Sequence, residues 1–317
     1  VLEGMKAYPK NKLIYRKGAD VNKNIGGVVR FDEKVKINEN DKSGFNAAKK
    51  AARNADVVVM VLGEDGFQSG EGRSRTKIDL PGVQQELLEE VYKVNKNIVL
   101  VLMNGRPLNI NWADKNIPSI VEAWQLGTQT GNAVAQVLYG DYNPSGKLPM
   151  SFPRSVGQIP IYYNYKNTGR PGPSKQIFWS QFNDQPNTPL YPFGFGLSYT
   201  TFGYSNIVID NKILKKDSSI NVSIDIENTG NLKGKEVVQL YLKDRYASVT
   251  RPVRELKGFE MIELSPGEIK TVNFKISEPL LKFYSANEIW ESELGFFDIF
   301  IGTDSNAIVK ESFELIE

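Results

Sequence analysis

The run DVVVMVLG, residues 56–63, decides the fold of the N-terminal half of this chain. Its residues are apolar without a break, and the run ends at a glycine. Such a run is typical of a strand that is buried on both faces of a parallel sheet. NIVLVLMNG at 97–105 and SIVEAW at 119–124 predict two more strands of this kind, and KLIY at 12–15 predicts a short one.

Helical stretches separate these runs. GFNAAKKAARNA at 44–55, VQQELLEEVYKVN at 83–95 and TGNAVAQVLYG at 130–140 have helical composition and spacing, and the last ends at a glycine. Strands that alternate with helices predict a mostly parallel α/β sandwich with flanking helices. The chain opens on LEGMKAY, which resembles the end of a helix, so we expect the first βα unit to lie upstream. This domain is predicted to span residues 1–165 and to be incomplete at its N-terminus.

The C-terminal part has a different pattern. After about residue 205, short segments alternate apolar and polar residues, and NTGN and SPGE mark turns between them. Seven or eight such segments predict an all-β sandwich, and without cysteines it would be of the fibronectin type III kind. We place this domain at 205–317. Residues 166–204, rich in Pro, Gly and Asn, are predicted to form a long loop and a domain joint.

Composition excludes several kinds of chemistry. The 317 residues include no cysteine and no histidine, so a Cys nucleophile, a Ser-His-Asp triad and a Cys/His zinc site cannot be built from them. The net charge of +2 gives no indication of nucleic-acid binding. No apolar run approaches the roughly 18 residues of a membrane span. Carboxylates are the natural candidates for catalysis, because a Glu can act as acid or base.

A loop rich in charged residues follows the first buried run directly. LGEDGFQSGEGRSRTKIDLPG, residues 62–82, has the Gly and Ser density of a loop. Its carboxylates include Glu64, Asp65 and Glu71, and Arg73 and Arg75 follow them. From these residues alone, either a solvated turn or a catalytic loop at the end of a buried strand is open.

Six ordered motifs carry a resemblance to a known family. They are SGEGRSRTKIDLPGVQQELL, NGRPLNINWA, EAWQLGTQTGNAVAQVLYGDYNPSGKLPMSFP, NTGRPGP, YPFGFGLSYTTF and RPVRELKGFE. In this order they resemble the family 3 glycoside hydrolases, in particular the bacterial periplasmic β-glucosidases. The resemblance covers essentially the whole chain, and the combination is specific although each motif alone is weak.

The resemblance implies a divided active site. Complete enzymes of the family have an N-terminal barrel, an α/β sandwich and a fibronectin-like domain, and this chain resembles the last two. The family removes terminal non-reducing β-D-glucose with retention, using an Asp nucleophile on the barrel and a Glu general acid/base on a loop of the α/β sandwich. By its position in the SGE motif, that Glu is Glu71. The residues expected to contact substrate are Phe67, Arg73, Arg75, Arg170 and Trp179, with loop organisation as the other role open to Arg73 and Arg75.

The resemblance also implies partners and a location. The partners are a β-linked oligosaccharide or glucoside and the barrel that carries the nucleophile, with no nucleic acid, no membrane, no metal and no cofactor. A homodimer is left open, and a bacterial periplasmic or secreted location is expected. Two alternatives remain: a β-xylosidase or other β-glycosidase of the same family, and a non-catalytic carbohydrate-binding or interaction fragment.

Overall fold

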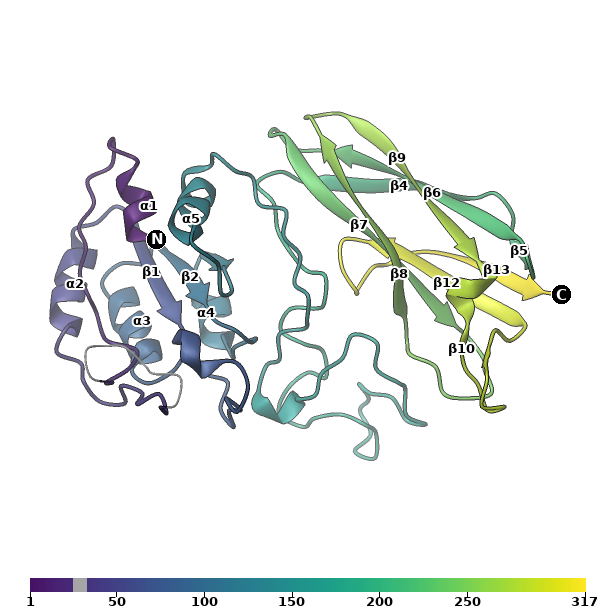
Figure 1. Cartoon of the computed structure of the whole chain (residues 1–317), viewed down its shortest axis with the longest axis horizontal. Coiled ribbons are helices and arrows are strands. Elements are labelled where there is room, and N and C mark those ends of the chain that lie inside the picture. The colour runs from purple at the N-terminus through teal and green to yellow at the C-terminus, as the bar shows by residue number, and fades with distance from the viewer. Residues whose placement is uncertain (25–32) are drawn as a thin grey trace. The chain divides into compact units, whose positions relative to one another are not determined.

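A computed structural model describes residues 1–24 and 33–317 of the chain (Figure 1). The chain forms two compact units, each of which is described by itself. Unit 1 comprises Val1–Tyr142 and Phe152–Ile159, and unit 2 comprises Asn143–Ser151 and Pro160–Glu317. No helix in these described ranges is both long and apolar enough to cross a membrane.

Unit 1 is an α/β structure, as predicted. Its parallel three-stranded sheet has the order β1-β2-β3, with Val58 opposite Ile98 and Val99 opposite Ser119. The described elements are α1 (Leu2–Lys6), α2 (Phe45–Arg53), β1 (Val58–Gly63), the 3₁₀ turn η2 (Gly66–Gln68), α3 (Gln84–Tyr92), β2 (Ile98–Met103), α4 (Asn111–Asn116), β3 (Ser119–Glu122), α5 (Thr130–Tyr139) and the 3₁₀ turn η3 (Val156–Gln158). Gly140 ends α5 in the left-handed conformation, with φ 82°, as its position in the sequence predicts.

Helices pack against both faces of this sheet. On one face, Val134 of α5 forms a buried cluster with Val101 of β2 and Ala123. Successive strand residues point to opposite faces, so Leu100 and Leu102 face the other side. There α3 packs on β1 and buries Leu88. Figure 1 shows α1 beside α5 and α2 beside α3, in agreement with their contacts.

Two local predictions in unit 1 are wrong. Residues 12–15 contain no strand, and Ile14 and Tyr15 remain exposed, because no neighbouring strand pairs with this segment. Strand β1 is not buried on both faces, since it lies at the edge of the described sheet and Val61 is 43% exposed. No sequence pattern predicted the short helix α4, because its N-terminus has no side-chain cap.

Unit 2 contains a two-sheet β-sandwich, as predicted. One sheet has the order β5-β13-β12-β7-β8 and the other β4-β6-β9, with β10 and β11 forming a separate pair. The strands are β4 (Phe202–Ile209), β5 (Ile213–Lys215), β6 (Ser219–Asn228), β7 (Gly234–Asp244), β8 (Glu255–Leu264), β9 (Ile269–Ser277), β10 (Phe283–Tyr284), β11 (Trp290–Glu291), β12 (Gly295–Gly302) and β13 (Val309–Ile316), and the 3₁₀ turn η4 is Glu278–Leu281.

The core of the sandwich follows from the alternation in the sequence. In β6, Ile220, Val222, Ile224 and Ile226 are buried, while the residues between them are more exposed. They form one cluster with buried residues of β7, β9, β12 and β13. Burying each such side chain stabilises the fold by roughly 1.5–3 kcal/mol, so this core is sufficient for a domain of its own.

Candidate active site

Polar residues lie at the carboxyl ends of the three strands of unit 1. Glu64 follows β1, Asn104 follows β2, and Glu122 is the last residue of β3. Because the strands are parallel, these three residues lie at the same, carboxyl edge, where α/β sheets commonly bind ligands. A glycine is needed at the end of β1: Gly63 has φ 145°, and a Cβ there would lie 1.9 Å from the Met103 carbonyl oxygen.

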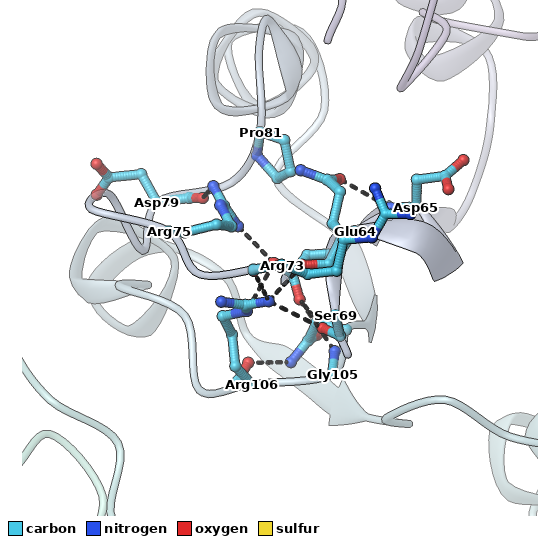
Figure 2. Close-up of polar contacts among 12 residues, drawn as sticks. Glu64, Asp65, Ser69, Arg73, Arg75, Asp79, Pro81, Gly105 and Arg106 are labelled. Atoms are coloured by element: carbon cyan, nitrogen blue, oxygen red, sulfur yellow. Dashed lines mark hydrogen bonds and ion pairs between the residues drawn. The ribbon is translucent and has the colours of Figure 1, made fainter. Parts of the chain in front are cut away.

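Glu64 is the buried centre of the loop that follows β1 (Figure 2). Its side chain is 0% exposed, and Arg75 Nη1 lies 2.5 Å from its Oε1. Arg106 also forms an ion pair with this oxygen, and its Nε lies 3.1 Å away. The other oxygen, Oε2, accepts hydrogen bonds from Ser69 Oγ at 3.2 Å and from the Gly105 N–H at 3.0 Å. Both oxygens of this carboxylate therefore have partners within the protein, and Glu64 has a structural role in the loop.

Asp65 also has a structural role. Its Oδ1 accepts the Phe67 N–H at 2.9 Å, and its own N–H donates to Gln68 Oε1 at 2.8 Å. Asp65 is the N-cap of η2, and it forms a capping box with Gln68, in which each side chain accepts from the backbone N–H of the other residue. Its Oδ2 accepts a hydrogen bond from Asn22 Nδ2 at 2.7 Å. Asp65 therefore fixes the first turn of the loop.

Glu71 differs from both of these carboxylates. It is exposed, and none of the residues in the described ranges forms a hydrogen bond or ion pair with its carboxylate. It lies between Gly70, with φ 123°, and Gly72, with φ 67°, and a Cβ at either glycine would meet nothing within 4 Å. Among the described residues, the tip of the loop therefore leaves this carboxylate without a partner.

Phe67, Arg73 and Arg75 are the other predicted site residues of this loop. Phe67 is 36% exposed, and the Arg73 guanidinium carbon lies 5.8 Å from the centre of its ring. Arg73 also donates from Nη1 to the Glu33 carbonyl oxygen at 2.9 Å. The Arg75 side chain points inward, since its Nη2 donates to the Asp79 carbonyl oxygen at 3.1 Å in addition to its contact with Glu64.

Arg170 and Trp179 belong to unit 2 and lie on one irregular segment. The Ser180 N–H donates to the Arg170 carbonyl oxygen at 2.9 Å. Because Ser180 follows Trp179 directly, this bond brings the backbone of Trp179 close to that of Arg170. Trp179 Nε1 donates to Gln176 Oε1 at 2.8 Å, and Arg170 itself is exposed. These two residues are therefore neighbours in their own segment of unit 2.

Glu122 is a titratable group that the sequence reasoning missed. Burial raises its pKa to about 7, and the charge of Glu64 also raises it. Hydrogen bonds from the Trp124 N–H, at 3.0 Å, and from Asn104 Nδ2, at 3.3 Å, lower the pKa but do not cancel the effect of burial. The sequence contains a signal that could have identified Glu122. It follows the start of a predicted strand at residues 119–121, just as Glu64 follows the predicted strand at residues 56–63.

The raised pKa of Glu122 predicts a pH-dependent stability. The folded protein keeps its proton between pH 4.5 and about 7, whereas the unfolded chain loses it, so stability falls as the pH rises through this window. At about 1.4 kcal/mol per pKa unit, the loss is on the order of 3 kcal/mol. Glu122→Gln should remove this loss, so urea denaturation should show the variant gaining stability over the parent protein between pH 5 and pH 8.

The exposed carboxylate of Glu39 offers a control for this measurement. Glu39→Gln should change the stability by the same small amount at both pH values. A Glu122→Gln variant whose difference from the parent protein is also constant between pH 5 and pH 8 would contradict the raised pKa.

The arrangement limits the chemistry that unit 1 can perform. Glu64, Asp65 and Asp79 each accept a hydrogen bond from another side chain or from the backbone, whereas no described residue contacts the Glu71 carboxylate. The described part of the chain contains no group of three or more His, Cys, Asp or Glu residues that could hold a metal ion. A loop carboxylate of this kind suits general acid/base catalysis.

Comparison with known proteins identifies the family of this chain. The family model described as "Glycosyl hydrolase family 3 C-terminal domain" matches residues 1–199. A second model, "Fibronectin type III-like domain", matches residues 236–305. Together they cover parts of both units.

Individual relatives agree with the family models. The chain is 47% identical over 312 residues to a periplasmic β-glucosidase of Salmonella typhimurium, an alignment that covers 96% of this chain and 41% of the relative. It is 44% identical to a β-xylosidase of Formosa agariphila, with 97% and 40% covered. Among solved structures, a β-glucosidase from Listeria innocua in complex with glucose has a TM-score of 0.84 and 39% identity, with 89% and 40% covered. The chain thus spans about two fifths of the length of these relatives.

Proposed function

This chain belongs to glycosyl hydrolase family 3, and we propose that it forms the C-terminal part of a retaining exo-β-glucosidase in which Glu71 is the general acid/base. The observation that carries the proposal is the contrast among the loop carboxylates. Glu64 and Asp65 are held by internal contacts and Asp79 accepts a hydrogen bond from Asn109, whereas Glu71 is exposed at the tip between two glycines and has no such contact with a described residue.

In this proposal Glu71 acts twice. In the first step its protonated carboxyl donates a proton to the glycosidic oxygen while the nucleophile attacks the anomeric carbon, and the aglycone leaves. In the second step the Glu71 carboxylate takes a proton from water, which attacks the glycosyl-enzyme and regenerates the nucleophile. Both displacements invert the anomeric carbon, so the sugar is released with its original β configuration.

The nucleophile is proposed to lie outside these residues. A retaining enzyme needs its two carboxyl groups about 5–5.5 Å apart, with both free to reach the sugar. Glu64 and Asp65 cannot serve, because each is engaged in structural contacts. We assign the nucleophile to an Asp on an N-terminal barrel, which is the arrangement that the family resemblance implies.

The remaining predicted residues are proposed substrate contacts. Phe67, which is exposed, and Arg73, which is half-buried, contact each other in the loop that carries Glu71, and we assign them to contact the leaving group. Arg75 acts through the loop that it holds, since both Nη atoms of its guanidinium are bound within it. Arg170 and Trp179 offer an exposed cation and a half-buried indole ring for an aglycone.

The choice of sugar rests on the relatives. Both a β-glucosidase and a β-xylosidase match the chain at similar identity, 47% and 44%. We propose glucoside as the substrate, with xyloside as the alternative within the family and a non-catalytic sugar-binding role as the alternative outside it. A periplasmic location follows the name of the Salmonella relative and is part of the same proposal.

The stereochemical course tests this function. For an enzyme that contains this chain together with its barrel, proton NMR of 4-nitrophenyl β-D-glucoside hydrolysis should show β-glucose forming first, before mutarotation, because retention requires two inversions. The value of kcat/KM should be higher for the glucoside than for the matched xyloside. An α-glucose product would contradict retention, a preference for the xyloside would favour the alternative sugar, and no turnover of either would favour a binding role.

A further inference from the structure

Glu71 lies in a four-residue turn that is closed by the hydrogen bond from the Arg73 N–H to the Gly70 carbonyl oxygen at 3.1 Å. Gly70 and Gly72, on either side, have positive φ values, and no atom of the described residues lies within 4 Å of a Cβ built at either of them. Glycine has the largest conformational freedom of any residue, so these two positions allow the tip to move. Beyond this one bond, the place of the turn relative to the sheet depends on contacts of the residues before and after it.

One side chain supplies contacts on both sides. Arg106 Nη2 donates to the carbonyl oxygen of Gln68 and lies 3.2 Å from Ser69 Oγ, before the tip. The same nitrogen donates to the carbonyl oxygen of Arg73, after the tip, at 3.1 Å. Figure 2 shows these contacts converging on the guanidinium of Arg106. The side chain therefore bridges the two ends of the segment that carries Glu71.

Arg106 is itself fixed by buried groups. Its Nε lies 3.1 Å from Oε1 of Glu64, whose side chain is 0% exposed. Its carbonyl oxygen accepts a hydrogen bond from Asn104 Nδ2 at 2.8 Å. Asn104 is fully buried and also lies 3.3 Å from Glu122 Oε2, so the turn after β2 is tied to the end of β3. These contacts hold the guanidinium at the carboxyl ends of the strands.

We propose that Arg106 is a positioning residue for catalysis, which acts through the loop by holding Glu71 where it can reach the glycosidic oxygen. The Arg106 side chain points to the loop backbone and to Glu64. This inference rests on the proposed role of Glu71 as general acid/base. An arginine suits this role because Nη2 reaches the two carbonyl oxygens while Nε lies beside Glu64, whereas a lysine offers a single nitrogen.

A double-mutant cycle with Glu71 tests the inference in the complete enzyme. Arg106→Gln should lower kcat/KM about 10- to 100-fold for phenyl β-D-glucoside, whose poor leaving group needs protonation, because a displacement of about 1 Å can have such an effect. It should change kcat/KM much less for the 2,4-dinitrophenyl glucoside. In a Glu71→Gln background, Arg106→Gln should change kcat/KM for the phenyl glucoside by less than about 2-fold, since the group that it positions is already absent.

Two further variants complete the design. Arg53→Gln, at an exposed arginine of α2, is a matched control and should leave both substrates unaffected. Arg106→Lys should fall between Gln and the parent enzyme, because it keeps the charge and loses the fork. If Arg106→Gln does not fold, Ser69→Ala replaces it, since this removes one contact of Arg106 and one of Glu64, and it should show a smaller loss with the same dependence on the leaving group.

The outcomes separate this inference from the proposed function. Equal losses for both substrates, or an Arg106 effect that persists undiminished in the Glu71→Gln background, would show a general structural role and overturn the inference. Unchanged activity of Arg106→Gln would also overturn it. If Glu71→Gln alone had no effect, the assignment of Glu71 itself would fail, and the proposed function would fail with it.

Discussion

Glu71→Gln is expected to reduce kcat/KM for phenyl β-D-glucoside by about 10²- to 10⁴-fold in an enzyme that contains this chain and its barrel. This is the typical contribution of a general acid, and glutamine has no proton to donate. With the 2,4-dinitrophenyl glucoside the first step needs no protonation. For this substrate kcat/KM should change little, while kcat should fall because water attacks the glycosyl-enzyme without a base. Steady-state and pre-steady-state kinetics on the two substrates measure both effects.

The control for this experiment is another exposed carboxylate of unit 1. Glu3→Gln, on α1, should leave the kinetics with both substrates unchanged. A Glu71→Gln enzyme with the same kcat/KM for the phenyl glucoside as the parent would remove Glu71 from the mechanism. A uniform loss across all leaving groups would indicate damage to the fold or to substrate binding.

The second large effect concerns the chain on its own. A protein made of these 317 residues should fold into its two units and yet give no measurable turnover of any aryl β-glucoside, because the proposed nucleophile is absent. Circular dichroism and thermal unfolding would confirm that the protein is folded, and a sensitive fluorogenic glucoside would measure turnover.

Contamination by a host glucosidase is the main alternative source of turnover in that assay. The chain carrying Glu71→Gln, purified in the same way, gives the background rate. Turnover by the parent chain that exceeds this background would mean that the nucleophile lies within these residues, and the divided active site would be contradicted.

Much of the fold could be predicted because its signals are local. The apolar runs at 97–105 and 119–124 became β2 and β3, and Gly140 ends α5 as predicted. The alternation in β6 predicted which of its residues would be buried. The failed prediction at 12–15 had the same apolar character, but a strand also needs a paired neighbour, and pairing depends on residues far away in the sequence.

The site could be predicted only in part. Glu71 was selected by the resemblance of its SGE motif to the family, and the loop itself was visible from its Gly and Ser content. The contacts of Glu64 with Arg106 and Gly105 join residues about 40 positions apart, through the register of β1 with β2. The raised pKa of Glu122 depends on burial, which a single sequence does not show for the last residue of a strand.

The most direct test of the central claim, that Glu71 is the acid/base of a retaining enzyme, is the product formed by Glu71→Ala in the presence of azide. With the 2,4-dinitrophenyl glucoside the glycosyl-enzyme should still form, and azide should attack it in the space left by the carboxylate. We predict that azide accelerates turnover and that NMR identifies the product as β-glucosyl azide, the result of two inversions. An α-glucosyl azide would identify Glu71 as the nucleophile, and the absence of any azide product or acceleration would contradict its role as acid/base.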